Sequence, residues 1–175
     1  MRVIAYGSML NMGSLAKTIK QREFKEVIIK NHKRIFNQRA ARLHLYNADP
    51  TQNKVAIANA VPEENSFFNA IMLEVDDYEF EKLKLREKNC HTKKVIAYDL
   101  KGEKIDEAIL FVGNKFYEGI EMVNNDYLPI EIYLKRCREG AYSISQEFGR
   151  QWDETTYIGD GKTIKKYLKE KDLNK

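Results

Sequence analysis

The chain has 175 residues, of which 43% are hydrophobic and 32% are charged, with a formal net charge of +4 at pH 7. These values are ordinary for a soluble protein of one domain with its own core. No apolar run approaches the roughly 20 residues of a membrane helix, and the first residues do not resemble a signal peptide, so we expect a cytoplasmic protein with no membrane partner. Cys90 and Cys137 are the only cysteines, which leaves no disulfide framework, and we expect both thiols to be reduced.

The opening stretch predicts a short buried strand that ends at a glycine turn. Three apolar residues and Tyr6 precede Gly7, which would turn the chain through a positive φ, and a helix is expected over residues 14–20. Backbone N–H groups at such a turn can hold a carboxylate or a phosphate. The pattern is equally explained if Gly7 only turns the chain and Ser8 only satisfies a nearby backbone group.

Most of the predicted strands lie in the middle of the chain. They cover residues 25–30, 33–37, 55–61, 67–75, 95–100 and 107–112. Pro62 would close the third strand, and residues 63–66 would form a turn before the fourth. Polar or mixed composition predicts loops over residues 38–52 and 114–126.

The predicted helices lie mostly in the second half. Asp76 and Asp77 offer N-caps for a helix over residues 78–87, and Pro129 opens a helix that Gly140 ends. Two more helices are expected over residues 143–152 and 162–169. Strands and helices do not alternate, so we predict a single α+β domain over residues 1–175, a small mixed or antiparallel β-barrel with flanking helices. Residues 162–175 would form a basic tail or a short helix.

The familiar patterns of catalytic and metal sites are missing. The three histidines lack the spacing of a helical zinc pair, and the adjacent Cys90 and His91 point apart on any regular element, so we expect no metal ion and no cofactor. Ser8 lacks the Gly-x-Ser-x-Gly context of a nucleophile. The remaining candidate is Glu87 at the end of the short helix, where a solvated glutamate is the ordinary alternative.

Positive charge is concentrated in residues 17–42, where nine Lys or Arg face two Glu, and again from residue 162 onward. Such segments attract an acidic metabolite, an acidic carrier protein or nucleic acid, or they form a solvated face. No zinc-finger, RNA-recognition or dinucleotide-binding pattern accompanies the charge, so we expect no nucleic-acid partner. Titration with DNA or RNA over a salt series tests this expectation.

Taken in order, these segments resemble the γ-glutamylcyclotransferase family (the AIG2-like and ChaC-like proteins) along nearly the whole chain. Tyr6-Gly7-Ser8 is similar to the Tyr-Gly-Ser signature of that family, and residues 83–87 are similar to its Leu-x-x-x-Glu segment. Residues 129–133 resemble its Pro-x-x-x-Tyr helix. Two positions depart from the family pattern: Met9, where many members have Asn or Leu, and Asn69, where a Gly is usual.

The resemblance implies an enzyme that cyclises a γ-glutamyl amide to 5-oxoproline and releases the attached amine or amino acid. It implies that Glu87 is the general acid/base, its pKa raised by an apolar, partly dry site. Arg86 and Lys88 would oppose that effect, so we expect their side chains to point away from the site. The implied substrate-binding residues are Tyr6, Gly7, Ser8, Met9, Leu10, Asn11 and Tyr133, the last of which is equally explained as a core residue.

The alternative is a non-catalytic protein of the same fold that binds a small anion or a partner. Glu87 favours the enzyme, and the two departures favour the alternative. The enzyme requires Glu87 to face the opening turn across a hollow the size of a curled glutamyl unit. The leaving group and the oligomeric state are not determined by the sequence; the basic segment only hints at an acidic substrate or a carrier protein.

Overall fold

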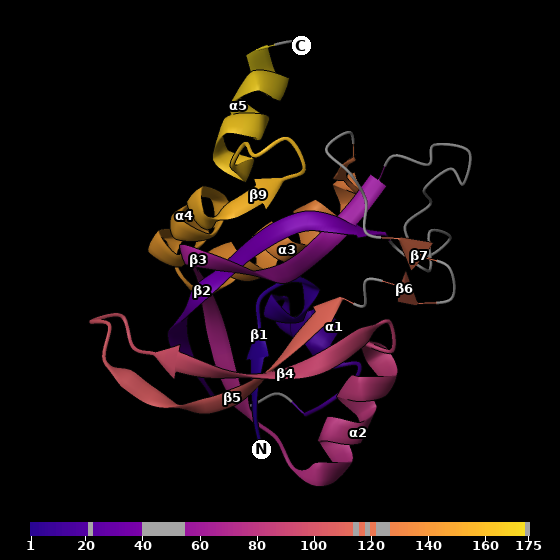
Figure 1. The fold of residues 1–175 in the computed structure, drawn as a ribbon, viewed down its shortest axis with the longest axis vertical. Coiled ribbons are helices and arrows are strands. Elements are labelled where there is room, and N and C mark those ends of the chain that lie inside the picture. The colour runs from indigo at the N-terminus through magenta and orange to yellow at the C-terminus, as the bar shows by residue number, and fades with distance from the viewer. Residues whose placement is uncertain (21–22, 40–54, 114–115, 118–119, 122–126, 174–175) are drawn as a thin grey trace.

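Five strands close into a β-barrel at the centre of the molecule, which we describe from a computed structural model (Figure 1). The model describes residues 1–20, 23–39, 55–113, 116–117, 120–121 and 127–173. The barrel strands are β1 (Arg2–Ala5), β2 (Phe24–Arg39), β3 (Val55–Glu74), β4 (Cys90–Tyr98) and β5 (Lys104–Gly113). Around the barrel they follow the order β1-β5-β4-β2-β3, and β3 pairs with β1 to close it. The predicted α+β barrel is confirmed.

The barrel is mixed because β1 and β5 are parallel, whereas its other pairings are antiparallel. Two short strands extend the sheet: β8 (Leu128–Pro129) pairs with β3, and β9 (Thr156–Ile158) pairs with β2. A separate ribbon joins β6 (Phe116–Tyr117) to β7 (Ile120–Glu121) within the predicted loop over residues 114–126, most of which lies outside the described residues. The sequence did not predict β8 or β9, since strands of two or three residues carry little pattern.

The strands β2 and β3 are each one long strand where the sequence predicted two. Asn31, with φ of 55°, forms a bulge within β2. Lys30 pairs with Phe67 and His32 pairs with Pro62, so residues 63–66 lie opposite Asn31 as an excursion of β3. The predicted turn over residues 63–66 is therefore a local irregularity, and Pro62 does not end the strand. The predicted loop over residues 38–52 is wrong at 38–39, which continue β2, and the rest of it lies outside the described residues.

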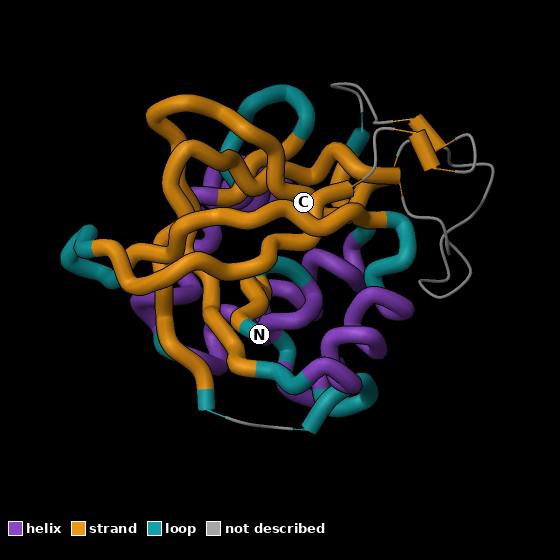
Figure 2. The backbone as a smooth tube through the Cα atoms, turned by 60° about the horizontal axis from the view of Figure 1, so that its bottom comes forward, coloured by secondary structure: helices purple, strands orange, loops and turns teal. Residues whose placement is uncertain are grey.

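Alternating side chains divide the core into two clusters. In β1, Ile4 belongs with Tyr6 to a cluster drawn only from the barrel strands and Tyr6, whereas Val3 and Ala5 belong to a cluster shared with the helices. This follows from the period of two in a strand, which points successive residues to opposite faces. Figure 2 shows the curved strands together, with helices packed against them. The cluster that contains Ile4 and Tyr6 fills the barrel, and the cluster that contains Val3 and Ala5 joins the helices to the outer face of the barrel.

The helices are η1 (Ser8–Leu10, a 3-10 turn), α1 (Met12–Leu15), α2 (Asp77–Arg86), α3 (Glu131–Ile144), α4 (Gln146–Thr155) and α5 (Ile164–Leu173). Helix α2 begins as predicted, because the Asp76 carboxylate accepts from the Glu79 N–H and the Glu79 side chain accepts from the Asp76 N–H. The helix predicted over residues 14–20 is wrong, since α1 ends at Leu15. The last three predicted helices are present with shifted ends.

Gly140 lies inside α3 and does not end it as predicted. A Cβ at this position would lie 2.6 Å from the Leu10 carbonyl carbon and closer still to the Asn11 amide nitrogen. Helix α3 therefore packs directly on the backbone of η1, and only glycine allows that approach. The general signal of glycine as a helix end was misleading here because a tertiary contact required the same residue.

Replacing Gly140 by Ala is expected to lower the free energy of unfolding by about 1–3 kcal/mol, because the added methyl overlaps backbone that cannot move aside easily. Urea denaturation measures the change. Gly13→Ala is the matched control: its Cβ would come no closer than 3.5 Å to the Asn11 side chain, and alanine favours a helix. Equal stability of Gly140→Ala and wild type would contradict this packing.

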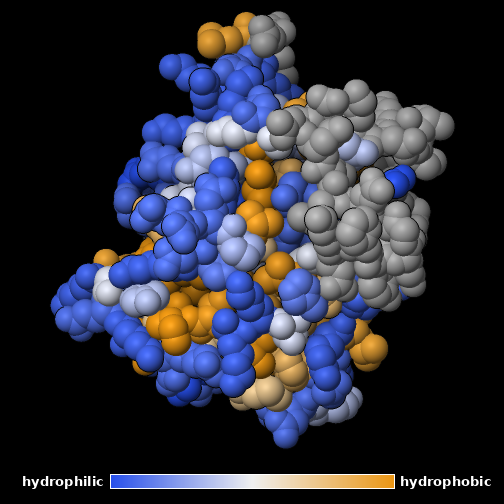
Figure 3. All heavy atoms as spheres, viewed as in Figure 1, coloured by the Kyte–Doolittle hydropathy of each residue, from blue (hydrophilic) through white to orange (hydrophobic). Residues whose placement is uncertain are grey.

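Among the described residues, hydrophilic side chains cover most of the face shown in Figure 3, with apolar areas between them. Several of the exposed charges are paired, as in Lys162 with Glu170 and Lys165 with Glu154. Among the described Lys and Arg of residues 17–42, Arg34 is fully buried. Among the described residues, no helix is both long enough and apolar enough to span a membrane.

Candidate active site

A small cavity lies where the end of β1, the turn η1 and the end of α2 meet. It is lined by Tyr6, Gly7, Ser8, Met9, Gln38, Ile57, Ala58, Glu87, Cys90, Phe111 and Tyr133. Four of these residues keep partial solvent exposure, namely Ser8, Ile57, Glu87 and Cys90, and the others are buried. The structure thus brings Glu87 to the opening turn of the chain, about 80 positions away in the sequence.

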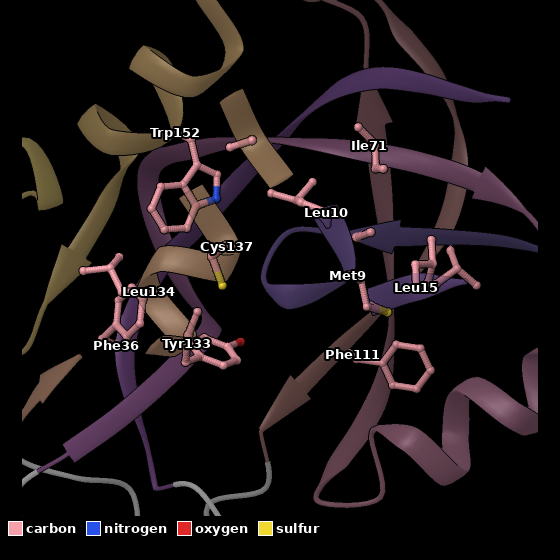
Figure 4. Packing of buried hydrophobic residues seen from close by; sticks show 14 of the residues in the cluster. Met9, Leu10, Leu15, Phe36, Ile71, Phe111, Tyr133, Leu134, Cys137 and Trp152 are labelled. Atoms are coloured by element: carbon pink, nitrogen blue, oxygen red, sulfur yellow. The ribbon is translucent and has the colours of Figure 1, made fainter. Parts of the chain in front are cut away.

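The cavity volume is ≈ 30 Å³, room for little more than one water molecule. This is smaller than the glutamyl-sized hollow that the sequence analysis required. Figure 4 shows the side chains of Met9 and Phe111 and the hydroxyl of Tyr133 around this space. A glutamyl unit fits only if side chains on the partly exposed side move outward.

Gly7 begins the turn, but not for the reason predicted. Its φ is −114°, so no positive φ requires glycine. A Cβ at Gly7 would instead lie 2.9 Å from the hydroxyl oxygen of Tyr133. Glycine therefore lets the Tyr133 hydroxyl approach the backbone of the turn. The amides that follow start a helical turn, where the first N–H groups have no acceptor within the helix.

The predicted residues Leu10 and Asn11 do not line the cavity. Leu10 is fully buried in the core, and its N–H donates to the Gly7 carbonyl at 3.0 Å. The Asn11 side chain caps α1 by accepting from the Ser14 N–H at 2.9 Å, and its own N–H donates to the Ser8 carbonyl. Both amides are thus used within the turn, which leaves those of Gly7, Ser8 and Met9 as the candidates for binding.

Glu87 is the C-cap of α2 and faces the cavity with 24% of its side chain exposed. Its N–H donates to the Leu83 carbonyl, and its own carbonyl accepts from the Cys90 N–H, so the helix end and the start of β4 hold its backbone. Burial raises the pKa of the Glu87 carboxyl, and the neighbouring Arg86 opposes that rise. The position and the pKa are those of a candidate proton carrier.

The prediction that Arg86 points away from the site is wrong because its side chain, although it does not line the cavity, contacts two residues that do. Its Nε donates to the Glu87 Oε1 at 3.2 Å, and its terminal nitrogens reach the Ser8 hydroxyl at 3.4 Å and the Ser14 carbonyl at 2.8 Å. The turn of chain from η1 to α1 packs beside α2, so Arg86 finds acceptors there instead of in solvent. Lys88 is exposed and is not among the residues that line the cavity.

Burial keeps the Tyr6 hydroxyl and the Cys90 thiol protonated. The Tyr6 hydroxyl donates to the Phe111 carbonyl at 2.7 Å, and burial raises its pKa well above the ordinary value. Burial likewise raises the pKa of the Cys90 thiol to about 12, which makes it a poor nucleophile. Tyr133 is 5% exposed and packs edge-on against Phe36. Its ring is thus in the core while its hydroxyl faces the cavity, which combines the two explanations left open above.

Arg34 supports the turn from behind, and the sequence analysis did not single it out. Its guanidinium donates to the Tyr6 carbonyl at 3.4 Å and to the Asn69 carbonyl and side-chain oxygen at 2.6 and 2.9 Å. Trp152 donates its ring N–H to the same Tyr6 carbonyl at 3.1 Å. Asn69, one of the two departures from the family pattern, is therefore a partner of this buried arginine. Position 34 lies on the same face of β2 as buried positions 32, 36 and 38, and this spacing of two was the available signal.

In the part of the chain that the structure describes, no group of three or more His, Cys, Asp and Glu side chains could hold a metal ion. Gln38 and Cys90 add polar atoms to the cavity that the sequence analysis did not predict, and the Gln38 amide is within 3.8 Å of the Cys90 sulfur. Together with Glu87, these residues support acid–base chemistry around one carboxylate.

No family model and no curated protein sequence matches this chain. Several solved structures are similar to this chain. A structure described as a γ-glutamyl cyclotransferase superposes with a TM-score of 0.65 at 14% identity, covering 97% of this chain and 98% of its own. A glutathione-specific γ-glutamyl cyclotransferase from yeast gives 0.60 at 13% identity, with coverages of 95% and 96%. An uncharacterized human protein gives 0.64 at 15% identity, with coverages of 96% and 97%. This chain has the γ-glutamylcyclotransferase-like fold.

The likeness to these structures extends over whole chains, so the barrel and the flanking helices together form the γ-glutamylcyclotransferase-like fold. At this identity the likeness describes the backbone and leaves the chemistry to the residues present. Within the fold, the cavity is lined by one carboxylate, two tyrosine side chains, one serine, one side-chain amide and one thiol. The arrangement can bind a small polar group, and it can move a proton through Glu87.

Proposed function

We propose that this protein is a γ-glutamylcyclotransferase, which converts a γ-glutamyl amide to 5-oxoproline and releases the attached amine or amino acid. One observation carries the proposal: Glu87 and the turn at Gly7 and Ser8 line one cavity in a chain of γ-glutamylcyclotransferase-like fold. The names of two structurally similar proteins state this activity, and one of them states glutathione as its substrate.

The reaction depends mainly on how the α-amine and the side-chain carbonyl of the substrate are oriented relative to each other. The α-amine nitrogen of the glutamyl unit attacks the carbonyl carbon of its own side-chain amide, and a five-membered ring closes. Glu87 accepts the proton that the attacking nitrogen loses and delivers it to the leaving nitrogen as the old C–N bond breaks. Because nucleophile and electrophile belong to one molecule, the substrate itself brings much of the advantage of an intramolecular reaction, which for well-oriented groups is on the order of 7–11 kcal/mol, and the site has only to hold the folded-back conformer.

The other cavity residues have supporting roles in this proposal. The amides of Gly7, Ser8 and Met9 donate to the substrate carboxylate or to the oxyanion. The Tyr133 hydroxyl, which lies beside Gly7, adds a further donor. Ile57 and Phe111 keep water from the reacting atoms. Substrate binding widens the cavity on its partly exposed side.

A substrate panel tests the proposal. The purified protein is incubated with γ-glutamyl amino acids, γ-glutamyl amines and glutathione, and released 5-oxoproline is measured by mass spectrometry. We expect release from at least one class, at a rate proportional to protein concentration. Release from none of them would overturn the proposal.

The small cavity volume favours a second candidate, a non-catalytic protein of the same fold that binds a small anion. Calorimetric titration with glutamate, 5-oxoproline and acetate distinguishes the two. Binding of an anion without any 5-oxoproline release supports the second candidate, whereas turnover of a γ-glutamyl compound excludes it.

A further inference from the structure

Arg86 occupies an unusual place beside the candidate site, because its guanidinium joins three segments of the chain. Each of its N–H donors has an acceptor within reach. The Nε bonds to Glu87 at 3.2 Å; one terminal nitrogen bonds to the Ser14 carbonyl at 2.8 Å and the Thr18 hydroxyl at 3.2 Å; the other bonds to the hydroxyls of Ser14 at 3.0 Å and Ser8 at 3.4 Å. Its side chain is 18% exposed.

These contacts connect the end of α2 to the two sides of the opening turn. Ser8 lies in η1, Ser14 in α1 and Thr18 just after it, whereas Glu87 caps α2. A planar guanidinium with donors in a fixed fork suits such a three-way junction better than a lysine ammonium does. The junction fixes how far the Glu87 carboxylate stands from the turn.

We infer that Arg86 is a positioning residue. Its guanidinium ties the Glu87 carboxylate to the turn at Ser8 and supplies the positive charge that pairs with this carboxylate. The inference rests on the proposed function, in which Glu87 must begin the reaction as a base. Arg86 does not line the cavity, so it acts through Glu87 and Ser8 and not on the substrate itself.

The described residues that line the cavity include no Asp, His, Lys or Arg, and Glu87 is the single Glu among them. Tyr6 follows β1, Cys90 begins β4 and Tyr133 belongs to α3, and the lining from β2, β3 and β5 is Gln38, Ile57, Ala58 and Phe111. The pKa values of Tyr6 and Cys90 are raised by burial, which keeps both neutral in the acid and neutral range. Among the described residues, Arg86 is therefore the cation that opposes the effect of burial on Glu87.

The test compares wild type with Arg86→Gln and Arg86→Lys by two readouts. Carbon-13 NMR titration of labelled glutamate carboxyls, with Glu87 assigned through Glu87→Gln, gives the pKa of Glu87 without turnover. The pH profile of kcat/KM on the best γ-glutamyl substrate gives the acid limb. Thermal unfolding checks that each variant is folded, and Lys84→Gln, on the exposed side of the same helix, is the matched control.

In Arg86→Gln we expect the pKa of Glu87 and the acid limb to rise together by about 1–3 pH units, since the opposing positive charge is gone. In Arg86→Lys the positive charge remains, so the pKa of Glu87 and the acid limb should both stay near their wild-type values. The value of kcat should fall, because an ammonium group cannot hold Ser8 and Ser14 together. A Glu87 pKa that does not move in Arg86→Gln, or that moves equally in Arg86→Lys, overturns the inference. Absence of any turnover counts against the proposed function, and the NMR titration still decides the role of Arg86.

Discussion

Replacing Glu87 by Gln is expected to lower the rate of 5-oxoproline release by about 10²–10⁴-fold, the usual contribution of a positioned acid/base. Glutamine has nearly the same shape and can still accept a hydrogen bond from Arg86, but it cannot take a proton. The measurement is kcat/KM on the best γ-glutamyl substrate, with substrate binding followed separately by calorimetry. We expect kcat to fall far more than affinity, because the lost group acts on the reacting atoms.

The pKa shift of Glu87 also predicts how the stability of Glu87→Gln compares with that of the wild type. Burial raises the pKa of Glu87 in the folded protein above 4.5, so between pH 4.5 and the folded pKa the unfolded chain releases its proton first. Stability from this group therefore falls as the pH rises through that window. Glu87→Gln has no such dependence, and at pH 7 its unfolding free energy should be no lower than that of wild type.

Glu81→Gln is the matched control because Glu81 lies in the same helix and its side chain is 64% exposed. It should leave the release rate unchanged. Equal release by wild type and Glu87→Gln would remove Glu87 from catalysis, even if another part of the cavity then proved to carry the activity. The acid limb of the wild-type pH profile should also lie above pH 4.5, since Glu87 must be ionised to act as a base.

Replacing Arg34 by Met is expected to lower the free energy of unfolding by about 3 kcal/mol. Methionine keeps the apolar stem but removes the donors to Asn69, and leaving a buried acceptor without a partner costs about 1–3 kcal/mol each. The loss of the cation between Trp152 and Phe68, whose ring centroids lie 4.8 and 5.2 Å from it, adds to the effect. Burial lowers the pKa of Arg34 to about 9, so the guanidinium is still charged at neutral pH.

Urea denaturation of Arg34→Met, Asn69→Ala and the double variant forms a thermodynamic cycle. Because Arg34 and Asn69 contact each other directly, we expect a coupling free energy of about 1–2 kcal/mol. Arg150→Met is the control, since Arg150 is 62% exposed and pairs only with Glu147 among its charged neighbours in the described structure; its change should stay within about 0.5 kcal/mol. A change of that size in Arg34→Met would mean that apolar packing replaces the network fully, as happens for some buried ion pairs.

Helix α2 is an element that the local sequence pattern was sufficient to predict. Asp76 and Glu79 form a capping box from four consecutive residues, and a helix that starts there and lasts ten residues places Glu87 at its end. The strands β4 and β5 were also predicted, because β-branched and aromatic residues recur in them, but the prediction missed residues 90–94 of β4 and 104–106 of β5 and extended β4 to residue 100. The class of fold followed from the order of these elements.

Glycines and buried polar residues show where local pattern was not sufficient. Gly140 serves close packing against Leu10 and Asn11, and Gly7 serves the approach of the Tyr133 hydroxyl, so neither could be understood without the partner segment. Arg34 reads as a surface cation until its acceptors are known. The expectation that Arg86 points away from the site failed for the same reason, since its partners Ser14 and Thr18 lie about 70 positions away.

The sequence by itself determined the α+β class and the capped helix that ends at Glu87, because each of these depends on patterns among residues close together in the chain. Only the tertiary structure decided that Glu87, Tyr133 and the turn share one cavity, that the cavity is small, and that two arginines support it from behind and beside. Those facts depend on which distant segments the barrel brings together, and a closed sheet sets such contacts through strand order and register and not through local propensity.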